Sequence, residues 1–118
     1  MRTLLSSLML SLLVPVAAHA QEWRVIDSWS GSGQLETQTF RVSSSEWRVD
    51  WEATPSGDYG SVFQVYVYRG DGTLVTLAAN VANQGGTSVS YVHAPPGEFY
   101  LMMNAANVNW SVEAEEPR

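Results

Sequence analysis

Side chains that commonly carry catalysis are scarce in this chain. Its 118 residues include no cysteine, no lysine and only two histidines, of which His93 alone lies after position 20. The chain therefore has no thiol nucleophile and no amine for a Schiff base, and one histidine cannot form a zinc site by itself. A Ser-His-Asp triad is arithmetically possible, but no Gly-x-Ser-x-Gly elbow accompanies it. We predict that the protein is not an enzyme and that His93 is a surface or loop residue.

Carboxylates are the most abundant chemically active groups. Asp50 and Glu52 alternate with apolar residues, so both should point outward from one strand, about 6–7 Å apart. A glycosidase needs two carboxylates facing each other across a cleft, and neighbours on one strand do not establish that arrangement. With Arg48 beside them and Arg41 on an expected adjacent strand, we interpret this cluster as cross-strand ion pairs on a solvated surface.

Two loops offer oxygen atoms that a calcium ion would accept as ligands. They are Gly57-Asp58 and Gly70-Asp71-Gly72, and neither belongs to an EF-hand or a glycine–aspartate repeat. Ordinary turns explain both loops, so we predict no metal ligand and no cofactor, with calcium left open. Arg69-Gly70-Asp71 also spells an adhesion tripeptide, but a tight hairpin needs the same Gly-Asp-Gly residues.

Three tyrosines are the best candidates for a binding face. Tyr66, Tyr68 and Tyr100 alternate with apolar neighbours in segments 62–68 and 98–103, so they should point away from the core. Aromatic rings with polar tips suit wet interfaces, where they could bind a partner protein or stack against sugar rings. The simpler alternative is that tyrosine is a good strand former on a half-exposed sheet.

Short alternating segments separated by turns must position these residues. Period-2 alternation predicts about eight strands, at residues 22–29, 35–42, 47–52, 62–68, 74–78, 88–93, 98–103 and 107–114. Glycine, proline and aspartate mark the turns between them, as in Ser30-Gly31-Ser32-Gly33 and Pro95-Pro96-Gly97. This pattern predicts an all-β protein, a single antiparallel β-sandwich of jelly-roll or immunoglobulin-like topology. The charged tail, residues 113–118, is expected to fray.

The first twenty residues have the features of a secretory signal peptide. Arg2 precedes an apolar run, and Ala18-His19-Ala20 resembles a cleavage site before Gln21. The run is too short for a membrane anchor, and no cysteine follows it that could carry a lipid. We therefore predict a signal peptide at 1–20 and one β-sandwich domain at 21–118, exported by the Sec route to the periplasm or the medium.

The charge balance narrows the class of partner. The formal net charge is −6, with twelve aspartates and glutamates against six arginines. Nucleic acid and anionic lipid both require clustered cations, so we predict neither as a partner and no membrane insertion after signal removal. With no disulfide available, packing of aromatic side chains must hold the core together.

The order of several motifs resembles a family of small β-sandwich domains. The motifs are Trp29-x-Gly31-x-Gly33, Trp47-Arg48-Val49-x-Trp51, Gly97-x-Phe99-Tyr100-Leu101 and Trp110-x-Val112. Together they resemble extracytoplasmic bacterial and archaeal domains of unknown function, which are loosely similar to pre-peptidase C-terminal and CUB-like sandwiches. Many relatives carry a lipobox or belong to a larger host protein, and we expect neither for this domain. The resemblance implies a fold and a location, and no catalytic residue.

Taken together, these features predict a non-catalytic secreted or periplasmic β-sandwich module. It would bind a protein or another component of the cell envelope, with Tyr66, Tyr68 and Tyr100 as the possible binding face. The alternative is a carbohydrate-binding module, with or without the assistance of calcium, whose partner would be an envelope glycan.

Overall fold

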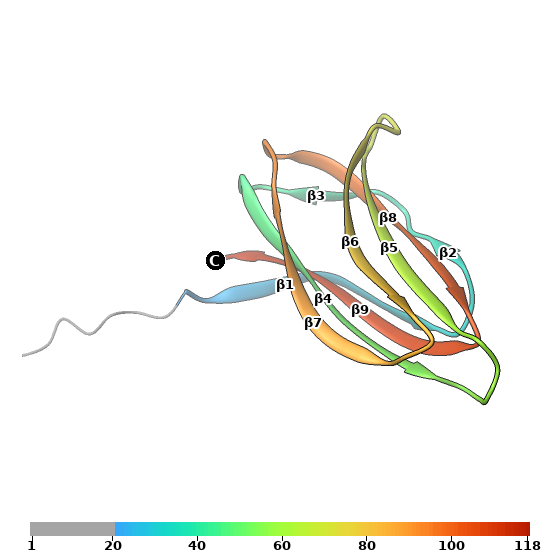
Figure 1. The fold of residues 1–118 in the computed structure, drawn as a ribbon. Coiled ribbons are helices and arrows are strands. Elements are labelled where there is room, and N and C mark those ends of the chain that lie inside the picture. The colour runs from blue at the N-terminus through green and yellow to red at the C-terminus, as the bar shows by residue number, and fades with distance from the viewer. Residues whose placement is uncertain (1–20) are drawn as a thin grey trace, which may run out of the picture.

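The protein folds as two antiparallel β-sheets packed face to face (Figure 1). The computed structural model describes residues 21–118, so the predicted signal peptide lies outside the described residues. The strands are β1 (Trp23–Gly31), β2 (Leu35–Glu36), β3 (Phe40–Val42), β4 (Glu46–Pro55), β5 (Val62–Arg69), β6 (Leu74–Ala82), β7 (Gly86–His93), β8 (Gly97–Ala106) and β9 (Val108–Pro117). The predicted all-β antiparallel sandwich is confirmed. No helix among residues 21–118 is long and apolar enough to cross a membrane.

The order of the strands decides between the two predicted topologies. The first sheet has the order β1-β9-β4-β7, and the second has the order β2-β8-β5-β6 with β3 also paired to β8. The first strand therefore lies beside the last, and the central strands of both sheets come from distant parts of the chain. An immunoglobulin fold would place its first two strands together in one sheet. The observed order is that of a jelly roll in which one strand is interrupted.

The interruption separates β2 from β3, which were predicted as one strand over residues 35–42. Thr37 lies at the break and is buried. Its N–H donates to the Leu101 carbonyl at 2.9 Å, and its Oγ1 accepts from the Leu101 N–H at 3.0 Å. A side-chain oxygen thus replaces a backbone carbonyl, which keeps the buried Leu101 N–H satisfied where the strand pairing breaks.

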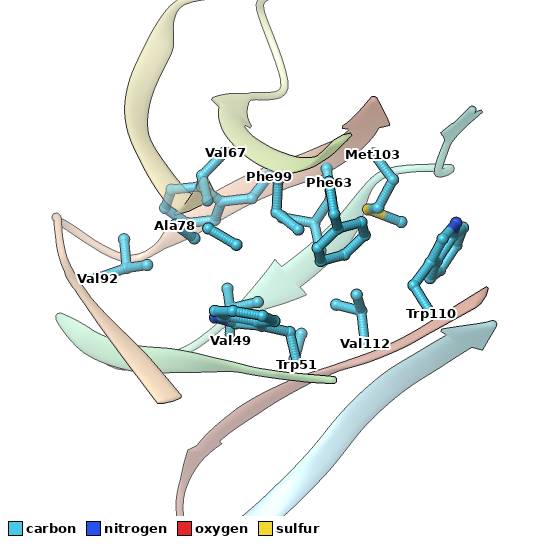
Figure 2. Packing of buried hydrophobic residues seen from close by; sticks show 14 of the residues in the cluster. Val49, Trp51, Phe63, Val67, Ala78, Val92, Phe99, Met103, Trp110 and Val112 are labelled. Atoms are coloured by element: carbon cyan, nitrogen blue, oxygen red, sulfur yellow. The ribbon is translucent and has the colours of Figure 1, made fainter. Parts of the chain in front are cut away.

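The core contains the inward residues that alternation predicts for the main strands, together with Phe40, Val42, Ala53, Ala78, Ala79 and Val92. Val49 and Trp51 of β4 face Phe63 and Val67 of β5 across the sandwich (Figure 2), and Trp47 of β4 is buried in the same core. Two aromatic clusters run through this layer, Phe40–Trp47–Phe99 and Trp51–Phe63–Trp110, with ring centroids 5.0–6.0 Å apart. Such aromatic pairs add to the free energy that burial of their apolar area already contributes. This extra stabilisation fits a small domain without disulfides.

The glycines of the Trp29-x-Gly31-x-Gly33 motif serve Trp110. A Cβ added at Gly31 would lie 3.1 Å from Cζ2 of the Trp110 ring, so a larger residue there would require the ring to shift by a few tenths of an ångström. The indole Nε1 then donates to the Gly33 carbonyl at 2.9 Å. The first and last motifs of the sequence are therefore parts of one packing unit.

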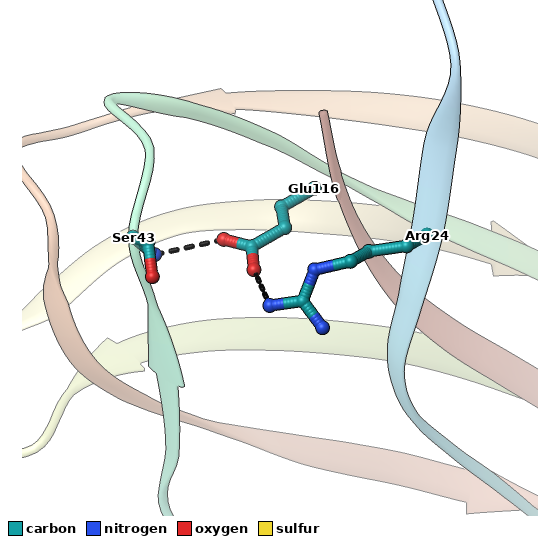
Figure 3. Close-up of polar contacts among 3 residues, drawn as sticks. All are labelled: Arg24, Ser43 and Glu116. Atoms are coloured by element: carbon teal, nitrogen blue, oxygen red, sulfur yellow. Dashed lines mark hydrogen bonds and ion pairs between the residues drawn. The ribbon is translucent and has the colours of Figure 1, made fainter. Parts of the chain in front are cut away.

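The prediction that residues 113–118 fray is wrong. Strand β9 continues to Pro117 between β1 and β4, and Glu116 is only 2% exposed. The Glu116 carboxylate pairs with the Arg24 guanidinium and accepts a hydrogen bond of 2.8 Å from the Ser43 N–H (Figure 3). The ion pair with β1 and the hydrogen bond to the β3–β4 turn hold the segment in place.

Candidate functional site

The three predicted tyrosines lie together on the outer face of the second sheet. Tyr68 on β5 is in register with Tyr100 on β8, and their rings stack at 5.1 Å and 12°. The ring of Tyr66 stacks on that of Tyr68 at 6.4 Å and 29°. All three side chains are partly buried. The structure therefore arranges them as a short stack across two strands.

Aliphatic side chains extend this stack into a larger apolar area. Leu74 and Leu77 of β6 are in register with Tyr68 and Tyr66 and are 54% and 40% exposed. Met102 lies beside Tyr66 on β8. We call this surface the tyrosine face, and it consists of Tyr66, Tyr68, Leu74, Leu77, Tyr100 and Met102.

Sequence alternation could not identify the two leucines. They are three positions apart, and a strict period of two would put them on opposite faces. The β5–β6 pairing shifts register twice, between Val65 and Tyr66 and between Val67 and Tyr68. These irregularities let both leucines face outward beside the tyrosines.

Polar contacts border the tyrosine face at both ends. The Tyr66 hydroxyl donates to Gln64 Oε1 at 3.2 Å, and Asn104 Nδ2 donates to the same oxygen at 2.8 Å. At the other end, Arg41 lies 3.9 Å from Glu98, and both side chains are exposed. Arg41 therefore belongs to the second sheet, and the prediction that it neighbours Arg48 is wrong.

The outer face of the first sheet carries a polar hollow of about 460 Å³. Two cross-strand rows form its floor, Ser28–Glu113–Asp50 and Ser30–Ser111–Glu52–Thr87. The carboxylates Asp50 and Glu52 thus share a surface, as predicted, and Glu113 of β9 joins them. We call this feature the hollow.

Negative charge is crowded at one side of the hollow. Asp50, Glu113 and Glu115 each place a carboxylate oxygen within 4.8 Å of the others, which is the only such group of three potential metal ligands among residues 21–118. Burial raises the pKa of Asp50 and of Glu113, and the charge of Glu115 raises both further. Two carboxylates of the hollow therefore hold their protons more firmly than usual.

Arg48 is bound to Glu115 at the end of this group. Its Nε donates to Glu115 at 2.5 Å, and its guanidinium lies 4.1 Å from the centroid of the Trp23 ring. The expected ion pairing of Arg48 therefore exists, but its partner is Glu115, a residue that was assigned to the frayed tail. Asp50 and Glu52 are not its ion-pair partners in the described structure.

The remaining candidate residues have structural roles or simple surface positions. His93 is exposed and lies 3.8 Å from Glu46. Asp71 accepts the Thr73 N–H at 2.9 Å within the β5–β6 turn, as the hairpin prediction implied. In the Arg69-Gly70-Asp71 tripeptide, the arginine donates to the Pro95 carbonyl and lies over the Phe99 ring. Neither Asp58 nor Asp71 belongs to a described group of three potential metal ligands.

The jelly-roll fold by itself does not indicate a function, because unrelated activities share such folds. Any function must therefore be argued from the two outer faces. No family model, no curated protein and no solved structure matches this chain.

Proposed function

We propose that the protein is a non-catalytic binding module that works outside the cytoplasm and recognises a protein of the cell envelope through the tyrosine face. The observation that carries this proposal is the stack of Tyr66, Tyr68 and Tyr100 beside two exposed leucines. Aromatic side chains are enriched in protein interfaces, and clustered exposed apolar residues mark interaction sites. The extracytoplasmic location rests on the predicted signal peptide and on the family resemblance.

The orientation of the rings favours a protein over a sugar at this face. Sugar stacking needs an aromatic ring whose flat side is open to the ligand. Tyr68 and Tyr100 are nearly parallel at 12°, so each turns a flat side toward the other. Ring edges, hydroxyl groups and leucine methyl groups suit a protein surface better. A carbohydrate-binding module remains the alternative function, and this geometry makes the tyrosine face a poor sugar platform.

Two edge strands of the sandwich, β1 and β6, are irregular in a way that opposes pairing with a strand of a partner protein. An exposed edge strand can pair with a strand of another protein, and β-bulges oppose such pairing by twisting the edge away. Edge strand β1 shifts register against β9 between Val25 and Asp27, and edge strand β6 shifts twice against β5. Strand addition is therefore disfavoured at β1 and β6, and these two edges favour a partner that binds across a sheet surface; edge strand β7 pairs with β4 without a register shift.

A capture experiment with matched variants tests the proposal. Immobilised protein is incubated with solubilised envelope extract, and bound proteins are quantified by mass spectrometry. Wild type and Tyr59→Ser should enrich the same protein, because Tyr59 is 81% exposed but lies outside the tyrosine face. Leu74→Ser/Leu77→Ser should lose it while keeping a wild-type circular dichroism spectrum. Equal capture by all three proteins, or enrichment of none, would contradict the proposal.

A further inference from the structure

The hollow presents two kinds of polar group in a regular array. Four hydroxyl groups, from Ser28, Ser30, Thr87 and Ser111, are exposed around the carboxylates of Asp50, Glu52 and Glu113. The hydroxyl groups come from β1, β7 and β9, and the carboxylates come from β4 and β9, so the hydrogen-bonded backbone of four adjacent strands fixes their spacing. A rigid array of this kind can recognise a ligand without first ordering a loop.

The lining indicates the chemistry of a fitting ligand. Ligand pockets of about 300–1,000 Å³ are mostly apolar, whereas the side chains on the floor of this 460 Å³ hollow are hydroxyls and carboxylates. Serine and threonine hydroxyls both donate and accept hydrogen bonds, and carboxylates accept them. A ligand with several hydroxyl groups would satisfy such a surface.

Charge narrows the ligand class further. Arg48 is the cation that acts on Asp50, but its Nε already donates to Glu115. The raised pKa values of Asp50 and Glu113 reflect burial together with neighbouring negative charge that is not fully compensated. An anionic sugar would be repelled here, and a positive charge would be attracted.

We propose that the hollow binds an amino sugar, whose ring hydroxyls contact Ser30, Thr87 and Ser111 while its ammonium group lies between Asp50 and Glu113. This site is on the sheet opposite the tyrosine face, so it is independent of the proposed protein partner. Its occupant is defined by two features together, the hydroxyl groups and the positive charge.

Three probes separate these two features. A glucosamine disaccharide carries both hydroxyl groups and ammonium groups, its N-acetylated form lacks the positive charge, and spermidine is a cation without hydroxyl groups. Each is titrated into isotopically labelled protein at a pH where the glucosamine amine is protonated, and backbone amide shifts are followed by NMR. The glucosamine disaccharide should shift the amides of Ser30, Thr87 and Ser111 and bind about tenfold more tightly than either control, the scale of one charge-assisted hydrogen bond.

Variants test whether the glucosamine disaccharide binds in the hollow. Asp50→Asn/Glu113→Gln should weaken binding of the glucosamine disaccharide about tenfold, since the charge-assisted contacts are lost. Glu36→Gln/Asp58→Asn removes the same two charges from exposed positions outside the hollow and should bind like wild type. Thr87→Val should weaken the disaccharide and leave spermidine unchanged.

Several results would overturn the proposal. Spermidine binding as tightly as the disaccharide would show a merely acidic surface, and equal binding of the N-acetylated form would show that charge plays no part. Amide shifts outside the hollow, or no shifts with any probe, would remove the site altogether.

Discussion

Trp110 and Gly33 join the last strand of the sandwich to the turn after the first. The Trp110 indole N–H donates to the Gly33 carbonyl at 2.9 Å. By contrast, the buried indole N–H groups of Trp47 and Trp51 have no acceptor among the described residues. Of these three core tryptophans, only Trp110 therefore has a hydrogen-bond acceptor for its indole N–H. Substitution of single tryptophans can measure how much this hydrogen bond contributes to stability.

We expect Trp110→Phe to destabilise the protein more than Trp51→Phe. Both changes remove the same volume, but only the first loses a hydrogen bond, while the second removes a buried donor without a partner. The difference in the free energy of unfolding should be about 1 kcal/mol. Urea denaturation followed by circular dichroism measures it, and an equal or reversed order would show that the indole hydrogen bond adds nothing.

We expect Gly31→Ala to destabilise the protein and Gly33→Ala to have little effect. A new Cβ at Gly31 would meet the Trp110 ring at 3.1 Å, whereas a Cβ at Gly33 has no heavy atom within 4 Å. Overpacking of this kind costs roughly 1–3 kcal/mol. Thermal unfolding of the two variants provides the comparison, and similar melting temperatures would mean that the ring moves aside freely.

Glu116→Ala should be far more damaging than Glu98→Ala. Glu116 is 2% exposed and binds both Arg24 and the Ser43 N–H, whereas the Glu98–Arg41 pair is exposed and 3.9 Å long. Loss of the buried carboxylate should cost about 2–4 kcal/mol, and loss of the exposed one less than about 1 kcal/mol. Hydrogen exchange should also show loss of protection in β1 and at Ser43. Unchanged protection there would argue that Glu116 does not hold β1 and the β3–β4 turn against β9.

Asp50 and Glu113 should make the protein less stable as pH rises. Their pKa values are raised in the folded state, first by burial and then by neighbouring negative charge, so the folded protein binds protons more firmly than the unfolded chain. Their contribution to stability is present below the ordinary carboxyl pKa and is lost as pH increases through the raised values.

The double variant Asp50→Asn/Glu113→Gln should therefore be more stable than wild type at neutral pH, and this advantage should shrink in acid. Urea denaturation across a pH series checks the sign. Asp71 provides a contrast, because its hydrogen bonds with Thr73 lower its pKa, so its contribution is lost as pH falls. If the double variant were less stable than wild type at neutral pH, this would contradict the claim that the ionised carboxylates of Asp50 and Glu113 destabilise the folded protein.

Much of the tyrosine face could be predicted because its position depends on local alternation. Tyr66, Tyr68 and Tyr100 were expected on an outer face, and they lie there because successive residues of a strand point to opposite sides. Leu74 and Leu77 escaped prediction because register shifts between β5 and β6 break that period. The hollow escaped it as well, since its residues come from four strands whose neighbours depend on long-range pairing.

The all-β class and the inward residues of the main strands could be predicted from the sequence, because alternation and turn residues are local properties of the chain. Which strands become neighbours depends on the tertiary fold. It placed Arg41 in the other sheet from Arg48, and it buried Glu116 between β1 and the β3–β4 turn. The composition of the tail alone suggests an exposed segment. In the fold, pairing of β9 with β1 and β4 satisfies the hydrogen bonds of its backbone. The burial of the tail therefore depends on contacts between residues far apart in the chain.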